Sequence, residues 1–435
     1  MKSRIVAVFL LSGGLLPFVN SSCTKEEEKY PQGLPIQADV LSFDPSSIND
    51  VADAPKFVYG PKTFPQMDNL ANLSSPRFKM LQGGNLEVKE SIGTVITSSQ
   101  FSGYSIPNLD YRAVNGVVKP ANNKSLMLLS ASYQFDSLID KIESLTGSKS
   151  DEFFDGFSSF NVLFHPSIVL QESDEQTRKY ETTNAAYVAG VKQFALFSLG
   201  KEERVPMTFN PQIISHEFGH AIFEKYFFNN KFERCNPNEV RNEKLFPGRI
   251  ENEYSVRGLN EGFADFVSFV WTGSTNIIQS SLGDQLLTRQ RNFSKANFDY
   301  DTYSAQEGQV CSGRFYCIGT LWAKTLLDVF KSRSLDPKIP EVRQQFLRET
   351  VSLLAKVGVA LRASDGAALP GPDERTKRCF NRDVHSPTAD GDMLAAFFVA
   401  LVGNADPGVK KSWCTSIVNN FGTSGFPISS RKVCQ

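Results

Sequence analysis

The sequence predicts an α+β fold in which strands come first and helices follow. Three observations support this prediction. The chain has 435 residues, of which 41% are hydrophobic and 21% charged, as is typical of a globular protein with a substantial core. Apart from one helical stretch, the patterned stretches before residue 210 are short and rich in β-branched and aromatic residues, as strands are. After residue 210 apolar residues recur mostly with helical spacing, so the second half is expected to be mainly helical.

Residues 1–22 have the pattern of a signal peptide. The chain begins with the basic "MKSR", continues with the apolar "IVAVFLLSGGLLPFV" and then reaches "NSSC". The apolar run is too short and too interrupted to predict a membrane-spanning helix. This end resembles a bacterial lipobox, which implies that Cys23 is lipidated, although Asn20 departs from the aliphatic residue usual there. We expect an exported envelope protein, anchored at the outer membrane through a lipid on Cys23; with ordinary cleavage nearby it would be periplasmic or secreted.

Three further regions follow the signal peptide. Residues 23–56 are polar and contain proline, which is typical of a tether. Residues 57–120 carry short strand-like runs such as "GTVITSS" and predict a small strand-rich region. Residues 121–435 form the main predicted domain, with a helix expected over residues 125–147. The net charge of −1 gives no reason to expect a nucleic-acid partner.

The strongest chemical signal is the short stretch "HEFGH". Asn210 is a suitable N-cap, and Pro211 a suitable first residue, for the helix that carries it. On that helix His216 and His220 lie one turn apart on one face, where two imidazoles can bind one zinc ion. Glu217 is then close enough to reach a water molecule at the ion, which is the physical basis of the HExxH motif. The alternative is a helix with two histidines in a satisfied core.

The stretch "GLNEGFADFVSF" predicts a second helix that supplies a third ligand. Asn260 is expected to cap this helix, with Glu261 in its first turn and Asp265 one turn later on the same face. Glu261 would complete a set of two histidines and one carboxylate, and a fourth position would remain open, as in catalytic zinc sites. Asp265 would accept a hydrogen bond from a ligand histidine and fix its tautomer. A solvated helix face is the alternative, which the surrounding apolar residues disfavour.

HExxH followed by NExxxD, here "HEFGH" and "NEGFAD", resembles the gluzincin metallopeptidases, especially the thermolysin-like and fungalysin-like branches. The resemblance implies a two-lobed zincin domain with a mixed sheet, an edge strand, an active-site helix and a mainly helical C-terminal lobe. It also implies that zinc is bound by His216, His220 and Glu261. Glu217 would be the general base, and Asp265 the hydrogen-bond partner of a ligand histidine. Calcium is a further expected ion, without assigned ligands.

The resemblance extends to the edge strand and to groups that stabilise an oxyanion. "TTNAAY" resembles the family's edge strand, which implies that the backbone at Asn184 and Ala185 pairs with an extended peptide substrate. Tyr254, seven residues before Glu261, is similar to the family's oxyanion tyrosine. "YCIGTLWAKTLLDV" resembles a fungalysin-like stretch but carries Tyr316 where the family has a histidine; a phenol can also donate to an oxyanion. The alternative for both tyrosines is an ordinary half-buried aromatic residue.

Cysteines and the remaining histidines are expected to be structural. Six cysteines remain after Cys23, an even number that predicts disulfides in an exported chain. We expect two local pairs, Cys311 with Cys317 and Cys414 with Cys434, and free buried thiols are the alternative. His165 and His385 have no evident partners in the sequence, so neither is expected to bind a metal.

These features predict an exported zinc endopeptidase that hydrolyses peptide bonds by a zinc-activated water with Glu217 as general base. Its partner would be a peptide or protein substrate. The chain has no GxMEN-like motif near the edge strand, which favours an endopeptidase over an exopeptidase. The alternative function is an envelope-binding lipoprotein that keeps the peptidase scaffold with weak or no catalysis. The tyrosine in place of the downstream histidine favours this alternative, and the complete ligand set opposes it.

Overall fold

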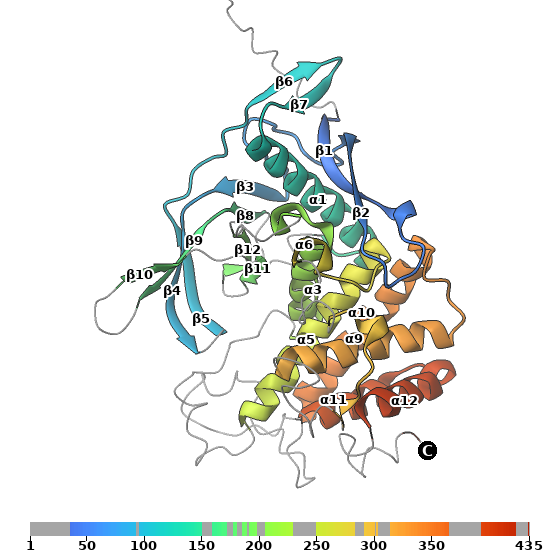
Figure 1. Cartoon of the computed structure of the whole chain (residues 1–435). Helices are drawn as coiled ribbons and strands as arrows, with labels where there is room; N and C mark the ends of the chain where they lie inside the picture. The colour runs from blue at the N-terminus through green and yellow to red at the C-terminus, as the bar shows by residue number, and fades with distance from the viewer. Residues whose placement is uncertain are drawn as a thin grey trace, which may run out of the picture. The chain divides into compact units, whose positions relative to one another are not determined.

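The computed structural model describes most of the chain from residue 35 onward. The described residues are 35–92, 95–149, 159–171, 177–180, 185–188, 191–197, 205–228, 249–282, 291–300, 302, 314–364, 393–422 and 434. Within them, strands come first and helices follow (Figure 1). The expected α+β character, with a β-rich N-terminal part and a mainly helical C-terminal part, is therefore confirmed. None of the described helices has the combination of length and apolar character that a membrane span requires.

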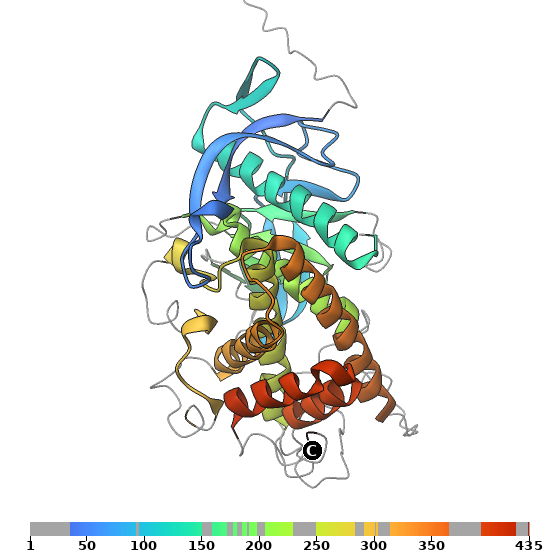
Figure 2. The same ribbon diagram turned by 90° about the vertical axis from the view of Figure 1, so that its right-hand side faces the viewer.

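The first sheet lies in the N-terminal region and contacts helix α1. Its strand order is β2-β1-β7-β6, and β1 pairs antiparallel with β2 and parallel with β7. Its strands are β1 (Gln37–Asp44), β2 (Lys56–Thr63), β6 (Tyr111–Val114) and β7 (Val117–Pro120). The helix α1 (Asn123–Thr146) begins after the Asn122 cap and ends at Gly147, which adopts φ 69°. In both views β1 runs beside α1 (Figures 1 and 2).

Two further sheets are built from strands that alternate between them along the chain. The second has the order β10-β9-β4-β5 and the third β11-β12-β8-β3. The second is built from β4 (Asn85–Ile92), β5 (Val95–Ser102), β9 (Ser167–Gln171) and β10 (Thr177–Tyr180). The third is built from β3 (Phe78–Gln82), β8 (Phe160–Phe164), β11 (Ala185–Val188) and β12 (Gln193–Leu196). The third sheet is mixed, because β11 is antiparallel to β12 whereas β12, β8 and β3 are parallel.

Four phenylalanines join the third sheet to the helices on its face. Phe160 and Phe194 lie on β8 and β12, and their rings contact Phe135 of α1 and Phe218 of helix α3 at centroid distances of 4.6 to 6.2 Å. All four side chains are almost fully buried. Burial of aromatic area on this scale is a large favourable contribution to folding. It also fixes the position of α3 against the sheet.

Helices form the second half of the described chain. They are α3 (Pro211–Phe227), α5 (Arg249–Thr272), α6 (Gln279–Leu282), α9 (Arg314–Ser332), α10 (Pro340–Ser364), α11 (Met393–Asn404) and α12 (Pro407–Phe421). Helix α5 packs on α3 along one side and on α9 along another. These contacts are very close. A Cβ on Gly219 of α3 would clash with Ala264 of α5, and a Cβ on Gly262 of α5 would clash with Gly319 of α9.

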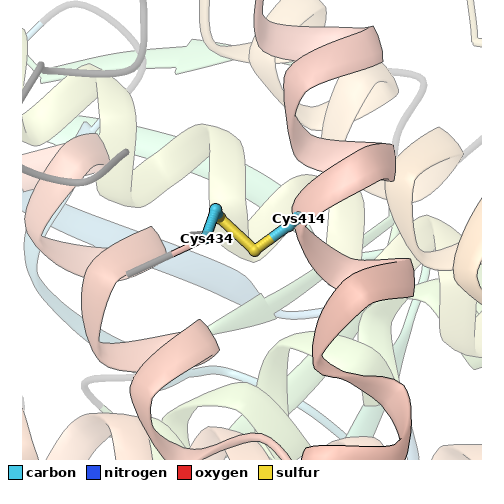
Figure 3. Close-up of a disulfide and its surroundings, with 2 residues drawn as sticks. All are labelled: Cys414 and Cys434. Carbon is cyan, nitrogen blue, oxygen red and sulfur yellow. A yellow bond between two sulfur atoms is a disulfide. The ribbon is translucent and has the colours of Figure 1, made fainter. Parts of the chain in front are cut away.

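One expected disulfide is present at the C-terminal end of the described chain. Cys414 of α12 is bonded to Cys434 with a Cα–Cα distance of 5.6 Å (Figure 3). Cys317 is also disulfide-bonded, and its expected partner Cys311 lies outside the described residues. The Cys414–Cys434 bond ties the segment that follows α12 back to that helix.

Candidate metal centre

The helix α3 forms as its sequence predicts. The Asn210 side chain accepts a hydrogen bond from the Gln212 backbone N–H at 3.0 Å, and Pro211 occupies the first turn. Both features stabilise a helix start because the first N–H groups of a helix have no internal partner. His216 and Glu217 are buried, with 5% and 7% of their surface exposed. The buried helix therefore presents its polar residues to other parts of the protein.

The histidines of α3 point their ring nitrogens toward one point. Nε2 of His216 lies 3.1 Å from Nε2 of His220. Together with Glu217 they form a group whose potential ligand atoms all lie within 4.8 Å of one another. This is a possible metal-binding group of the HExxH type.

Glu261 on α5 approaches the same point. Its carboxylate oxygens lie 3.4 Å from Nε2 of His216 and 4.0 Å from Nε2 of His220. The close packing of Gly219 against Ala264 makes this approach achievable, since a larger residue at either position would separate α3 from α5. A tetrahedral ion with bonds of about 2.0–2.1 Å holds its ligands roughly 3.3 Å apart. The three separations fit such an ion after small side-chain adjustments.

The second nitrogen of each histidine faces an oxygen atom. Nδ1 of His216 lies 2.8 Å from Oδ1 of Asp265, and Nδ1 of His220 lies 2.9 Å from Oδ1 of Asn260. A carboxylate can only accept, so Nδ1 of His216 is the donor, and the amide oxygen of Asn260 likewise accepts from His220. These two bonds leave the Nε2 lone pairs directed at each other and at Glu261. The donor set therefore fits a cation bound between them.

The position of Asn260 corrects one expectation from the sequence. The helix α5 begins at Arg249, so Asn260 lies within the helix and does not cap it, and Glu261 is not in a first turn. The helical pattern continues upstream of Asn260 through residues with mixed polarity, which concealed the true start. The hydrogen bond between Asn260 and His220 gives the asparagine a different role, namely orientation of a histidine.

The carboxylates control the protonation of this group. Burial lowers the pKa of His216, but its hydrogen bonds to Asp265 and Glu261 outweigh burial and raise the pKa to about 9. Burial raises the pKa of Glu261, but the hydrogen bond to His216 and the nearby positive charges outweigh it and lower the pKa to about 2. Glu261 is thus a carboxylate at neutral pH. Without a metal ion, a proton on His216 neutralises part of the negative charge of Asp265 and Glu261.

Arg291 is a further member of the site that sequence reasoning did not find. Its guanidinium forms a buried ion pair with Asp265, and its Nη2 lies 3.5 Å from Oε2 of Glu261. Its Cζ lies 5.0 Å from the ring centroid of Tyr316. Burial lowers the pKa of Arg291, whereas Asp265 and Glu261 raise it more, so the guanidinium stays charged. The local sequence "RQRNF" contains no motif that marks this arginine.

The strand β11 contacts Glu217 through its backbone. The Tyr187 N–H donates to Oε2 of Glu217 at 2.7 Å. The Tyr187 hydroxyl donates to Oε2 of Glu224, about two turns further along α3, at 2.8 Å, and Lys192 pairs with the same carboxylate. Residue Ala185, expected in the edge strand, is the first residue of β11 and is buried. Two carboxylates of α3 thus hold the strand beside the histidines.

The remaining expected site residues divide into those that are near the group and those that are not described. Tyr316 on α9 lies near it. Burial and the charge of Glu261 raise the Tyr316 pKa to about 12, so its phenol keeps the proton that a donor needs. Tyr254 belongs to α5, but its side chain lies outside the described residues, as do Asn184, Cys23 and His385.

No family model matches the chain, and a search of curated proteins found no match either. Any inference about function therefore depends on the geometry of this site. A cavity of about 320 Å³ between α9, α10 and α12 shares no residue with it.

Proposed function

We propose that the chain is an exported zinc endopeptidase of the gluzincin type. The observation that supports this proposal best is the convergence of three electron-pair donors. The Nε2 atoms of His216 and His220 face each other at 3.1 Å, and a Glu261 oxygen lies 3.4 Å from the first. Three lone-pair donors at this distance repel one another unless a positive charge lies between them, either a proton on His216 or a metal ion. Two imidazoles and one carboxylate are a preferred ligand set for catalytic zinc.

Glu217 is suited to proton transfer at this site. Zinc, when bound, would lower the pKa of a water molecule and polarise a substrate carbonyl. Glu217 lies beside the histidines, and one of its oxygens is fixed by the Tyr187 N–H at 2.7 Å. Its other oxygen remains to accept a proton from the attacking water and to deliver it to the leaving amine. Tyr316 is close enough to Glu217 and Glu261 for their charges to raise the pKa of its phenol, which can donate a hydrogen bond. The Arg291 guanidinium lies over the ring of Tyr316.

The strand β11 supports a peptide as the substrate. Within a strand, residues two apart direct their backbone groups to the same side. Tyr187 directs its N–H away from β12 and toward Glu217, so Ala185 directs its N–H and C=O to that side as well. Among the described strands, β11 pairs only with β12. An extended peptide that added to this edge would lie with its backbone next to Glu217.

The alternative proposal is an envelope protein that binds peptides without turnover. Tyr316, in place of the histidine usual in the resembling family, is the observation that favours it. Export with a lipid anchor at Cys23 is part of both proposals and rests on the N-terminal sequence alone.

The test compares the purified chain from residue 24 onward with its Glu217→Gln variant. Zinc content is measured together with hydrolysis of casein. We expect one zinc per chain in both proteins, and chelator-sensitive hydrolysis in the parent that falls by at least about 100-fold in the variant. The glutamine oxygen can still accept from the Tyr187 N–H, so the strand contact persists. Zinc without hydrolysis in the parent would favour the binding protein, and a fully active variant would refute Glu217 as the base.

A further inference from the structure

The connector between β1 and β2 is bound by residues more than 200 positions away. The Val51 carbonyl accepts from the Thr275 N–H at 2.6 Å, and the Ala52 carbonyl from the Asn292 side chain at 3.2 Å. The Asp53 carbonyl accepts from the Ser274 hydroxyl at 2.5 Å. Three consecutive carbonyls thus bind to the segment after α5 and to Asn292. In Figure 2 the blue connector passes beside the yellow segment that follows α5.

The residues that donate these hydrogen bonds are buried. Ser274 and Thr275 have no exposed surface, and Asn292 has 5%. The Thr275 hydroxyl lies 3.0 Å from the Val51 carbonyl and 2.9 Å from Oδ1 of Asn292, so its single proton is shared between an oxygen of the connector and one of the asparagine. Buried polar groups are costly without partners, so such a network holds its members in one arrangement.

The connector belongs to a longer segment that is attached to α1. The Leu41 N–H donates to the Ser130 hydroxyl at 2.9 Å. The N–H groups of Gln66 and Met67 donate to Oδ2 of Asp136 at 2.8 and 3.2 Å. We name residues 37–67 the N-terminal strap. The strap therefore joins α1 to the segment after α5 and to Asn292.

Asn292 connects the strap to the metal centre. The preceding residue, Arg291, pairs with Asp265, which hydrogen-bonds His216. A long arginine side chain reaches a fixed position only if its backbone is fixed, because ordering its rotamers costs entropy. The backbone at Asn292 is held by the bridge to Asn276 and, through its side chain, by the strap.

We propose that the N-terminal strap is a positioning element of the peptidase: by holding Asn292 it fixes Arg291 at Asp265 and Glu261. The chain then works with the strap attached, and processing that removed residues 37–67 would inactivate the enzyme. This inference rests on the proposed function. It concerns a part of the chain that precedes the main domain expected from the sequence.

The test is a double-mutant cycle between Thr275→Val and Arg291→Lys in the whole exported chain. Thr275→Val removes the linking hydroxyl at almost constant volume, and Arg291→Lys keeps the charge but loses the forked geometry. We expect Thr275→Val to lower kcat/KM by about 10- to 100-fold, since a displacement of roughly 1 Å is enough for such a loss. The rate of zinc loss to a chelator should rise in the same variant. In the Arg291→Lys background both effects should largely disappear.

Two matched variants separate positioning from general stability. Thr275→Ser keeps the hydroxyl and should retain the activity of the parent. Ser46→Ala lies in the same connector, where Ser46 hydrogen-bonds only Asp44 among the described contacts, and should also retain it. If Thr275→Val does not fold, as judged from its melting temperature, Asn292→Ser takes its place in the cycle.

The outcomes distinguish the two proposals. A parent chain without zinc and hydrolysis would refute the proposed function and this inference with it. An active parent in which the two substitutions act additively, or in which Thr275→Val has no effect on kcat/KM and zinc loss, would refute the strap inference alone.

Discussion

Two histidines of this protein, His216 (buried) and His165 (half-buried), have opposite environments. His216 on α3 faces Asp265 and Glu261, which raise its pKa to about 9 against the effect of burial. His165, at the end of β8, stacks on Phe164 at 3.9 Å, and burial lowers its pKa to about 4, with a smaller contribution from Lys124. Burial alone makes an imidazole a neutral packing group. Burial beside Asp265 and Glu261 instead lets the His216 imidazole hold a positive charge, and His220 lies next to it on α3.

The largest expected effect comes from the removal of a ligand. Glu261→Gln keeps the shape of the side chain but removes the negative charge that faces both Nε2 atoms. We expect zinc affinity, measured by competition with a chelator, to fall by at least about 100-fold, because even outer hydrogen-bond partners contribute 10- to 100-fold. His165→Asn serves as the matched control and should bind zinc like the parent. Equal affinities of Glu261→Gln and the parent would exclude Glu261 as a ligand.

A smaller effect is expected from Asp265→Asn. The asparagine can still occupy the position 2.8 Å from Nδ1 of His216, but it provides no charge to the histidine or to Arg291. Zinc affinity should fall by about 10- to 100-fold, as for other carboxylate–histidine–metal arrangements. Asp328→Asn is the control, because Asp328 is a hydrogen-bonded carboxylate of α9 that accepts from Asn420. An unchanged affinity in Asp265→Asn would show that Asp265 does not support the ligand.

The sequence predicted the local parts of this site correctly. The Asn210 cap, the start of α3 at Pro211 and the common face of His216 and His220 depend on neighbours within one or two helical turns. The order of strands and helices follows from the same short-range patterns. Such features depend on spacing along the chain, which is visible in a single sequence.

The parts that the sequence did not reveal depend on contacts between distant segments. Arg291 meets Asp265 only because the segment after α5 returns to the helix, and Tyr187 meets Glu224 only because β11 lies along α3. The start of α5 at Arg249 was missed because Asn260 looked like a cap. Capping residues also occur inside helices, where tertiary contacts give them other roles.

A buried carboxylate on which burial outweighs the charge of Arg77 extends the comparison. Asp136 on α1 accepts two backbone N–H groups, yet burial raises its pKa to about 6 from 3.8. The folded protein therefore holds a proton that the unfolded chain releases, and stability should increase as the pH falls from about 6 to about 4. Asp136→Asn should lose this dependence, which is worth on the order of 2 kcal/mol. Unfolding by denaturant at several pH values measures it, and parallel curves for parent and variant would contradict the prediction.

The smallest expected effect has the opposite sign and belongs to His165. Its pKa of about 4 in the folded protein lies below the usual 6.5, so the unfolded chain binds a proton first as the pH falls. This contribution to stability is present above pH 6.5 and is lost between pH 6.5 and about 4. The partial exposure of the ring limits it to about 1 kcal/mol. His165→Asn should remove the loss, and asparagine tolerates the backbone φ of 56° at this position. In the same denaturant series, the free energy of unfolding of His165→Asn relative to that of the parent should rise as the pH falls, so that the variant is the more stable protein at acid pH. For Asp136→Asn, the difference from the parent should shrink as the pH falls. A His165→Asn variant that lost zinc would instead show that the two histidine environments are coupled.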